Sequence, residues 1–259
     1  MPGRMAGRVA LITGGGGGIG EATARLFAEE GAAVAVVDVE RAAVDKAADG
    51  IAAAVPGVQV LPLAADLARE DEARRVVDAT VARFGGLHSL VNVAGVRLYT
   101  PLAEADADGW QHILGVNVLA AAFCCKAAIP TLRAAGGGTI VNVSSVYGVL
   151  GRAGMGQYDT TKAAILGFTR ALAVEEARHG IRVNAVCPAG TITAYHIRRA
   201  AEKGVSEEEL RRSRHQDNGL LGRWAEPREV AYPILFLACA ESSFVTGATL
   251  MVDAGRSVL

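Results

Sequence analysis

Tyr158 and Lys162 stand four residues apart in the segment GQYDTTKAAILGFTRALAVE, residues 156–175. In a helix this spacing places both side chains on one face. A free tyrosine has a pKa of ~10 and is a poor base near neutral pH, but a nearby ammonium lowers that pKa because it favours the phenolate. The pair is therefore a candidate acid–base unit, although many amphipathic helices carry Tyr and Lys at this spacing by chance.

Two further polar residues are candidates for the same site. Ser145 ends the predicted strand 139–145, thirteen residues before Tyr158, and open α/β sheets bind ligands at that edge. Its hydroxyl can donate a hydrogen bond to a substrate oxygen, or it can simply end the strand or cap a helix. Asn117 is polar within an apolar predicted helix, where a buried amide needs partners, so a satisfied core group is the alternative to a functional role.

A glycine run precedes these residues in the chain. The stretch ITGGGGGIG, residues 12–20, follows the predicted strand 9–13 and opens a helical pattern, so it is a turn between buried elements and not a linker. Gly14, Gly18 and Gly20 would let a phosphate approach the backbone at the positive end of that helix. The pattern predicts a dinucleotide site.

Asp38 ends the second predicted strand, eighteen residues after Gly20. A carboxylate at this place accepts hydrogen bonds from a ribose diol and repels a 2′-phosphate, which favours NAD over NADP. A solvated aspartate at a strand end is the alternative, and the glycine turn makes that alternative weaker.

Strand-like and helix-like segments alternate along the chain and must position these groups. The strands are nearly continuous apolar runs, which indicates burial on both faces. They are expected at 9–13, 32–38, 58–63, 88–93, 139–145, 181–188 and 249–253. We therefore predict a single α/β domain over residues 1–259, a Rossmann-like doubly wound seven-stranded parallel sheet with helices on both faces. Residues 191–224 are polar and charged and predict an inserted helical flap.

Composition excludes several function classes. The 259 residues are 51% hydrophobic and 20% charged, with a net charge of −1 and no basic block, so we expect neither a nucleic-acid nor a membrane partner. The N-terminus lacks a long apolar segment, so a cytoplasmic protein is expected. The four cysteines show no C-x-x-C pairing and the five histidines no metal-ligand spacing, so no metal is expected.

Across essentially the whole chain the sequence resembles the short-chain dehydrogenase/reductase family. Thr13, Gly14, Gly18 and Gly20 match its T-G-x-x-x-G-x-G motif, and Tyr158 and Lys162 its Tyr-x-x-x-Lys motif. The resemblance implies an Asn117, Ser145, Tyr158 and Lys162 tetrad, in which Tyr158 exchanges the substrate's hydroxyl proton beside the positive nicotinamide ring. In it Lys162 grips the nicotinamide ribose, and Asn117 holds a water that links Lys162 to solvent.

The resemblance also implies the rest of the cofactor site. NADP-preferring members carry a basic residue where this chain has Gly17 or Val39. The segment NVAG departs from the family's N-N-A-G at Val93. Thr191 and Thr193 remain rivals for a phosphate contact, because the family's Pro-Gly appears here as Pro188-Ala189. The further residues expected at the cofactor are Ile19, Asp66, Leu67, Asn92, Ala94, Gly95 and Gly190.

The substrate should be a small alcohol or ketone that contacts residues from four segments. They are Arg97, Tyr99, Ser145, Val146, Arg152, Gln157, Tyr158 and His196. Several of these side chains are basic, as are Arg198 and Arg199, so an anionic hydroxy acid or sugar acid is one hypothesis. Solvated flap charges are the other.

The expected function is NAD-dependent interconversion of a secondary alcohol and a ketone. An NADPH-dependent reductase of 3-ketoacyl type is the alternative, and Asp38 and Gly17 count against it. A non-catalytic NAD-sensing scaffold is a further alternative, but such proteins typically lose the Tyr or the Lys. The segments GRWAEPREVA and VTGATLMVDAG match parts that the family uses to assemble, so a homotetramer is expected.

Overall fold

Seven parallel strands form one sheet in the order β3-β2-β1-β4-β5-β6-β7. The computed structural model describes residues 3–213 and 218–259. The strands are β1 Val9–Thr13, β2 Ala33–Asp38, β3 Val60–Ala64, β4 Ser89–Asn92, β5 Gly138–Val143, β6 Ile181–Pro188 and β7 Thr249–Val252. The predicted doubly wound fold is confirmed. Strand β5 ends two residues earlier than predicted, so Ser145 follows the strand and does not end it.

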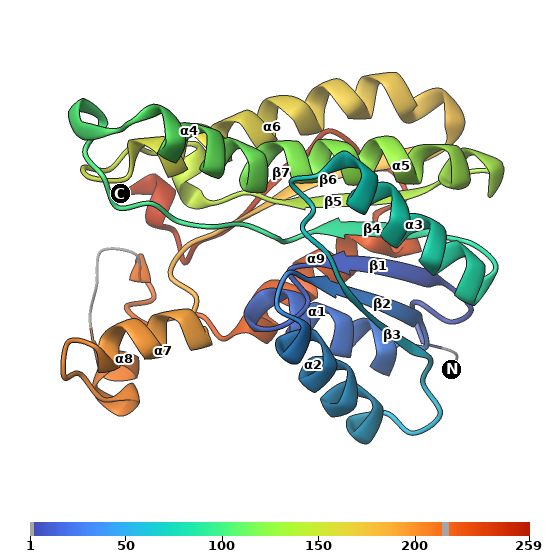
Figure 1. Cartoon of the computed structure of the whole chain (residues 1–259), viewed down its shortest axis with the longest axis horizontal. Helices are drawn as coiled ribbons and strands as arrows, with labels where there is room; N and C mark the ends of the chain where they lie inside the picture. Colours follow the sequence, from blue (N-terminus) through green and yellow to red (C-terminus); the bar gives the residue numbers. More distant parts are fainter. Residues whose placement is uncertain (1–2, 214–217) are drawn as a thin grey trace.

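Helices cover both faces of the sheet (Figure 1). They are α1 Gly18–Glu29, α2 Arg41–Ala54, α3 Glu70–Phe84, α4 Ala107–Leu114, α5 Ala120–Ala134, α6 Gly156–Glu176, α7 Ala194–Ala201, α8 Glu207–Arg212 and α9 Pro227–Ala238. One apolar core lies between the sheet and α1, α2 and α9, and a second lies between the sheet and α3, α5 and α6. The sheet is thus buried on both faces, as its apolar strands require.

The order of the strands reverses beside β1, which lies between β2 and β4. Thr13 is therefore in register with Val37 on one side and with Asn92 on the other. Loops that follow β1 and β4 leave in opposite directions from this place. In an open α/β sheet such a reversal makes a crevice at the carboxyl ends of the strands.

The stretch Ala107–Ala134 is long and apolar enough, by length and composition alone, to cross a membrane. It comprises α4, a π-helical turn at Gly115–Leu119, and α5. Cys124, Cys125 and Leu132 of α5 are fully buried in the core that α5 shares with α3 and the sheet. This packing accounts for the apolar character of the helix.

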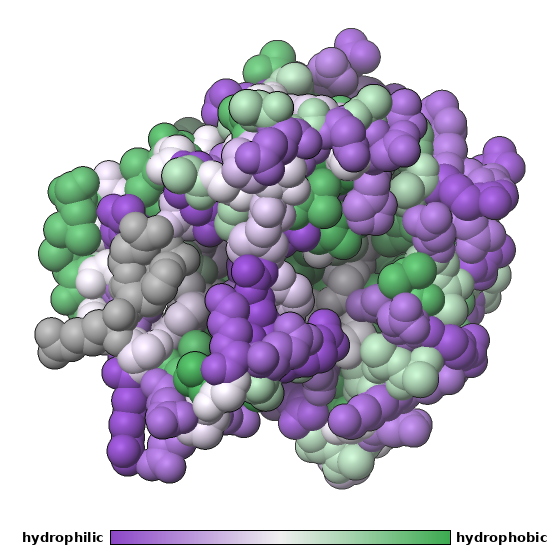
Figure 2. Space-filling model, turned by 60° about the vertical axis from the view of Figure 1, so that its left-hand side comes forward, coloured by the Kyte–Doolittle hydropathy of each residue, from purple (hydrophilic) through white to green (hydrophobic). Residues whose placement is uncertain are grey.

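Two helices, α7 and α8, lie in the segment that the sequence marked as an insertion, apart from the sheet (Figure 1). Ser206 and Glu209 form a reciprocal capping box at the start of α8. Figure 2 shows this end of the molecule, which is mostly hydrophilic, with hydrophobic residues inside a hollow. Residues 214–217 of the segment lie outside the described residues.

Candidate active site

A cavity of about 950 Å³ opens at the carboxyl edge of the sheet, where the strand order reverses. It brings together most of the residues that the sequence singled out. These are Gly14, Gly17, Gly18, Ile19, Asp38, Val39, Asp66, Leu67, Ala94, Gly95, Arg97, Ser145, Tyr158, Lys162, Pro188, Thr191, Thr193 and His196. Residues more than 180 positions apart in the chain thus share one wall.

The glycine turn forms a cradle at the start of α1. Gly14 and Gly18 have positive φ angles of 64° and 54°, which favour glycine. A Cβ on Gly20 would lie 2.0 Å from the carbonyl oxygen of Gly14, so a side chain there cannot fit. Gly17 is extended and has open space around it. The turn leaves bare backbone at a helix N-terminus, which fits a pyrophosphate.

Asp38 lies at one end of this cavity, beside the turn. Its carboxylate accepts hydrogen bonds from the backbone N–H groups of Gly16 at 3.0 Å and Val39 at 2.8 Å. A Cβ on Gly16 would lie 2.8 Å from that carboxylate, so Gly16 has a steric reason to be glycine. The carboxylate is thus fixed in place with further acceptor capacity for a ribose diol.

Tyr158 and Lys162 are both buried on α6. The Lys162 Nζ lies 5.7 Å from the centre of the Tyr158 ring and donates a hydrogen bond to the Val143 carbonyl at 3.0 Å. Burial raises the pKa of Tyr158, whereas the charges of Lys162 and Arg97 lower it. A hydrogen bond with Ser145 and the charge of Arg152 act in the same direction, so the net pKa is below 10. Burial also lowers the pKa of Lys162.

The two adjacent serines after β5 have different roles in the structure. The Ser145 Oγ accepts a hydrogen bond from the Tyr147 backbone N–H at 3.2 Å, and Ser145 lines the cavity. The Ser144 Oγ donates to the Lys162 carbonyl at 2.7 Å and thereby joins β5 to α6. Both serines line the cavity, but the Ser144 hydroxyl is engaged in this contact between the two elements.

Asn117 lies in the π-helical turn and is buried, but it does not line the cavity. Its Oδ1 accepts from the Val96 N–H at 2.7 Å, and its Nδ2 donates to the Val96 carbonyl at 3.0 Å. The Nδ2 also donates to the Thr161 hydroxyl at 2.9 Å. The side chain thus holds the loop after β4 against α6, and both its oxygen and its nitrogen are engaged. Single π-turns of this kind are frequent at functional sites.

Thr13 and Asn92 lie behind the cavity wall. The Thr13 Oγ1 accepts from the N–H groups of Val93 and Ala94 at 3.0 and 3.2 Å, which fixes the loop after β4. The Asn92 Nδ2 donates to the Asn142 Oδ1 at 2.9 Å, whereas its Oδ1 is buried without a hydrogen-bond partner among the described residues. Both residues shape the site through its backbone.

The segment after β6 separates Thr191 from Thr193. Both line the cavity, but only the Thr193 methyl carbon lies at the glycine turn, 3.0 Å from where a Cβ on Gly18 would be. Thr191 is buried, and its hydroxyl donates to the Ala189 carbonyl at 3.3 Å. Thr193 is thus the one of the two threonines that lies against the glycine turn. Gly190 faces a different cavity.

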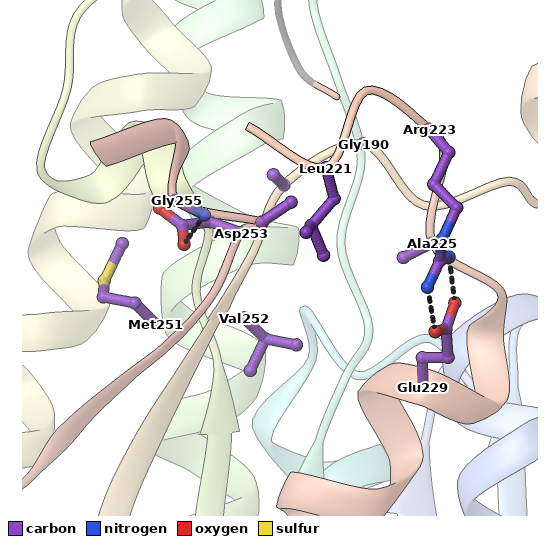
Figure 3. Close-up of a pocket in the computed structure, with 11 residues that line it drawn as sticks. Gly190, Leu221, Arg223, Ala225, Glu229, Met251, Val252, Asp253 and Gly255 are labelled. Carbon is purple, nitrogen blue, oxygen red and sulfur yellow. Dashed lines mark hydrogen bonds and ion pairs between the residues drawn. The ribbon is translucent and has the colours of Figure 1, made fainter. Parts of the chain in front are cut away.

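That second cavity, of about 360 Å³, lies between the end of β7 and the base of the inserted segment (Figure 3). Arg223 donates to both oxygens of Glu229 at 2.7 and 2.6 Å, and this pairing lowers the pKa of Glu229 to about 2. Asp253 accepts from the backbone of Gly255 at 3.1 Å. The charged groups at this cavity are thus engaged with each other or with backbone.

Only some of the residues expected to contact the substrate line the large cavity. Arg97 and His196 line the large cavity with Ser145 and Tyr158. The others do not line it: Tyr99 is exposed, Val146 and Gln157 are buried, and Arg152 pairs with Asp159. Sequence reasoning missed Gln111, His112, Gly115 and Val116 of the α4 region, and Ala194 and Tyr195 of α7. Their place depends on how α4 and α7 fold over the sheet edge, and no spacing signal reveals it.

Comparisons with known proteins agree with this geometry. The sequence profile described as Enoyl-(Acyl carrier protein) reductase matches residues 15–257. A short chain dehydrogenase/reductase of Aspergillus oryzae is 38% identical and covers 98% of this chain and 97% of its own. The cis-4-hydroxycyclohexanecarboxylate dehydrogenase of Sinomonas cyclohexanicum is 40% identical and covers 97% of each.

A solved structure extends this agreement to the fold. L-sorbose reductase from Gluconobacter frateurii, in complex with NADPH and L-sorbose, superposes with a TM-score of 0.94 at 32% identity over 100% of both chains. Sequence profile, relatives and structure agree over nearly the full length. The chain belongs to the short-chain dehydrogenase/reductase family, and it is an oxidoreductase that acts on CH–OH groups with NAD(P).

Proposed function

We propose that this enzyme interconverts a secondary alcohol and its ketone with NAD, and that Tyr158 takes and returns the hydroxyl proton. The observation that carries the proposal is a buried tyrosine at the cavity wall whose pKa is lowered by Lys162, four residues on along α6. A phenol in this setting can exchange a proton near neutral pH. The Sinomonas relative, a hydroxycyclohexanecarboxylate dehydrogenase by name, and the sorbose reductase support the reaction class.

Three further side chains have separate roles in the proposed reaction. The Ser145 Oγ accepts from the Tyr147 N–H and is hydrogen-bonded to Tyr158, so a substrate oxygen that binds between them would receive the Ser145 proton while Tyr158 deprotonates it. Lys162 uses one of its three N–H donors on the Val143 carbonyl, which leaves two for a ribose hydroxyl and a proton relay. Asn117 supports this relay by holding the loop at Val96. The nicotinamide ring, when bound, supplies or accepts the hydride.

The cavity fits a dinucleotide along its length. The glycine turn and the start of α1 would hold the pyrophosphate, with Thr193 beside it. Asp38 would accept from the adenosine ribose, and Asp66 and Leu67 would lie at the adenine. The residues Pro188, Ala94 and Gly95 would lie toward the nicotinamide end.

We infer the preference for NAD from the charges present and absent at the ribose end of the cavity. Asp38 and Glu40 put two carboxylates at the ribose end, where a 2′-phosphate would be repelled. Gly17 and Val39 carry no basic group to bind that phosphate, although both line the cavity. Because the sorbose reductase complex contains NADPH, the preference of this enzyme must be tested by measuring its activity with both NAD and NADP.

The test is a turnover screen of secondary alcohols with NAD and with NADP, followed at the nicotinamide absorbance. We expect turnover of at least one alcohol and a higher kcat/KM with NAD. A higher kcat/KM with NADP would refute the cofactor preference. Turnover of no alcohol or ketone with either cofactor would refute the proposed reaction.

A further inference from the structure

Charged side chains are segregated along the large cavity. Its three carboxylates, Asp38, Glu40 and Asp66, all follow or end β2 and β3, at the adenosine end. Its cations come from the opposite side of the strand reversal: Arg97 after β4, Lys162 on α6 and Arg198 on α7. No Asp or Glu among the described residues lines that second end. The part of the cavity beside Tyr158 is therefore electropositive.

Arg97 is a cation beside Tyr158 that has no carboxylate partner among the described residues. Its guanidinium carbon lies 5.7 Å from the ring centre of Tyr158 and 5.6 Å from that of Tyr195. One of its nitrogens contacts the His196 Nε2 at 2.6 Å, and the guanidinium also interacts with the hydroxyls of Tyr99 and Tyr158, but no carboxylate of the described residues pairs with it. A half-buried guanidinium with only neutral partners favours a ligand that supplies an anion.

Arg152 is a natural comparison, because it lies on the same tyrosine but in a different electrostatic state. Its guanidinium carbon is 5.2 Å from the Tyr158 ring centre and 3.7 Å from that of Tyr147. However, its Nε lies 3.3 Å from the Asp159 Oδ1, and Arg152 does not line the cavity. Its charge is thus already balanced by a neighbour. Of the two arginines beside Tyr158, only Arg97 is available to a substrate.

A cluster of aromatic and basic side chains holds Arg97 in place. Arg199 of α7 stacks on the Tyr99 ring at 3.5 Å and donates to the Tyr195 hydroxyl at 3.2 Å. The Tyr195 hydroxyl donates to that of Tyr99 at 3.1 Å, which joins α7 to the loop after β4. Arg97 belongs to this loop and contacts Tyr195 and His196 of α7. Its position is therefore restrained before a substrate binds, as recognition by a planar guanidinium requires.

We propose that the alcohol substrate carries a carboxylate and that Arg97 binds this group beside Tyr158. This inference rests on the proposed function, since it names the class of alcohol that the same site accepts. A planar carboxylate matches the paired N–H groups of a guanidinium and would supply the missing counter-charge. The substrate is then a hydroxy acid, and the product of oxidation is a keto acid.

The experiment compares hydroxy acids with their methyl esters, which keep the carbon skeleton and remove the charge. Pairs of 2-, 3- and 4-hydroxy acids and esters are assayed with NAD and NADP. For at least one skeleton we expect a kcat/KM that is roughly 10- to 100-fold higher for the acid than for the ester, the range of a hydrogen bond to a charged group. Turnover of esters with no preference for any acid would overturn the inference and leave the proposed function intact.

Variants assign the selectivity to Arg97. Arg97→Gln should lower the ratio of kcat/KM for the acid to that for the ester roughly 10-fold or more, because any loss that comes from a higher pKa of Tyr158 is common to both substrates. Arg97→Lys should restore part of this ratio. Arg83→Gln is the matched control, because Arg83 is an exposed arginine at the far end of α3, at the opposite edge of the sheet. An equal loss for acid and ester in Arg97→Gln, with the thermal midpoint unchanged, would refute recognition by Arg97.

Discussion

The Asp38 carboxylate accepts a hydrogen bond from the Gly16 N–H at 3.0 Å, so the residue that we propose binds the ribose is bonded to the turn that we propose binds the phosphates. A substitution of either residue, Gly16 or Asp38, affects the other. A Cβ on Gly16 would approach the carboxylate to 2.8 Å, and removal of the carboxylate would free the turn. Cofactor choice and turn geometry are therefore linked in this protein.

The first prediction concerns that choice. The double variant Asp38→Ser, Val39→Arg removes the repulsive carboxylate and adds a cation at an exposed position. We expect the ratio of kcat/KM for NADP to that for NAD to rise roughly 100-fold, because a guanidinium binds a phosphate through charge-assisted hydrogen bonds. Steady-state assays with both cofactors measure the ratio. Asp45→Ser, on the exposed part of α2, is the control and should leave it unchanged.

The second prediction concerns the proton. Tyr158→Phe keeps the buried ring and removes the hydroxyl, so turnover should fall by a factor on the order of 1,000. Binding of NADH, measured by fluorescence titration, should change little, since the adenosine and phosphate sites are intact. Residual turnover above a tenth of the original would contradict the role given to Tyr158.

A third prediction follows from the lowered pKa of Tyr158. For alcohol oxidation the phenol must lose its proton, so kcat/KM should rise with pH through a pKa below 10. Lys162→Met removes a lowering charge and should move that rise to higher pH, besides reducing the rate. A pH series in the oxidative direction measures the shift. The exposed Lys126, which pairs with Glu70 on the surface, gives the control Lys126→Met, for which no shift is expected.

The fourth prediction concerns stability. Glu176 is buried, with a side chain 3% exposed, and Arg133 donates to both of its oxygens at 2.6 and 2.8 Å. This hydrogen bonding lowers the pKa of Glu176 below 4.5, so the pair stabilises the fold above that pH and loses its effect as pH falls through the lowered value. Arg133→Ala should lower the free energy of unfolding at pH 7, because it leaves the Glu176 carboxylate without its charged partner, and should lower it less in acid.

Urea denaturation at several pH values measures this loss. The exposed pair Arg41 and Asp45 supplies the comparison, since Arg41→Ala should cost about 0.5 kcal/mol or less. A loss for Arg133→Ala that is the same at every pH would mean that packing, and not the charge of Glu176, causes it.

Much of the fold and of the cofactor site could be predicted from the sequence, because both depend on local patterns. Strands buried on both faces are apolar throughout, and the glycine turn stands between the first strand and its helix. The position of Asp38 beside the glycine turn could be predicted because Asp38 ends the neighbouring strand β2. Each of these signals lies within a few residues of the element that it predicts.

Contacts between distant segments could not be predicted in this way. Arg97 and Arg152 look equivalent in the sequence, and only folding gives Arg152 a partner in Asp159 while Arg97 lies against α7. Val146 and Gln157 flank Ser145 and Tyr158 in the chain but are buried away from the cavity. The reason for Gly16 also became visible only when the Asp38 carboxylate was located beside it.

Helix α7 connects the two halves of the site. Thr193, at its start, lies at the glycine turn, and its hydroxyl bonds the Nδ1 of His196, whose Nε2 contacts Arg97. A dinucleotide at Thr193 would therefore be separated from Arg97 by one side chain, that of His196. If the cofactor contacts Thr193 and the substrate contacts Arg97, the two sites are coupled through His196, and each ligand should bind more tightly when the other is present.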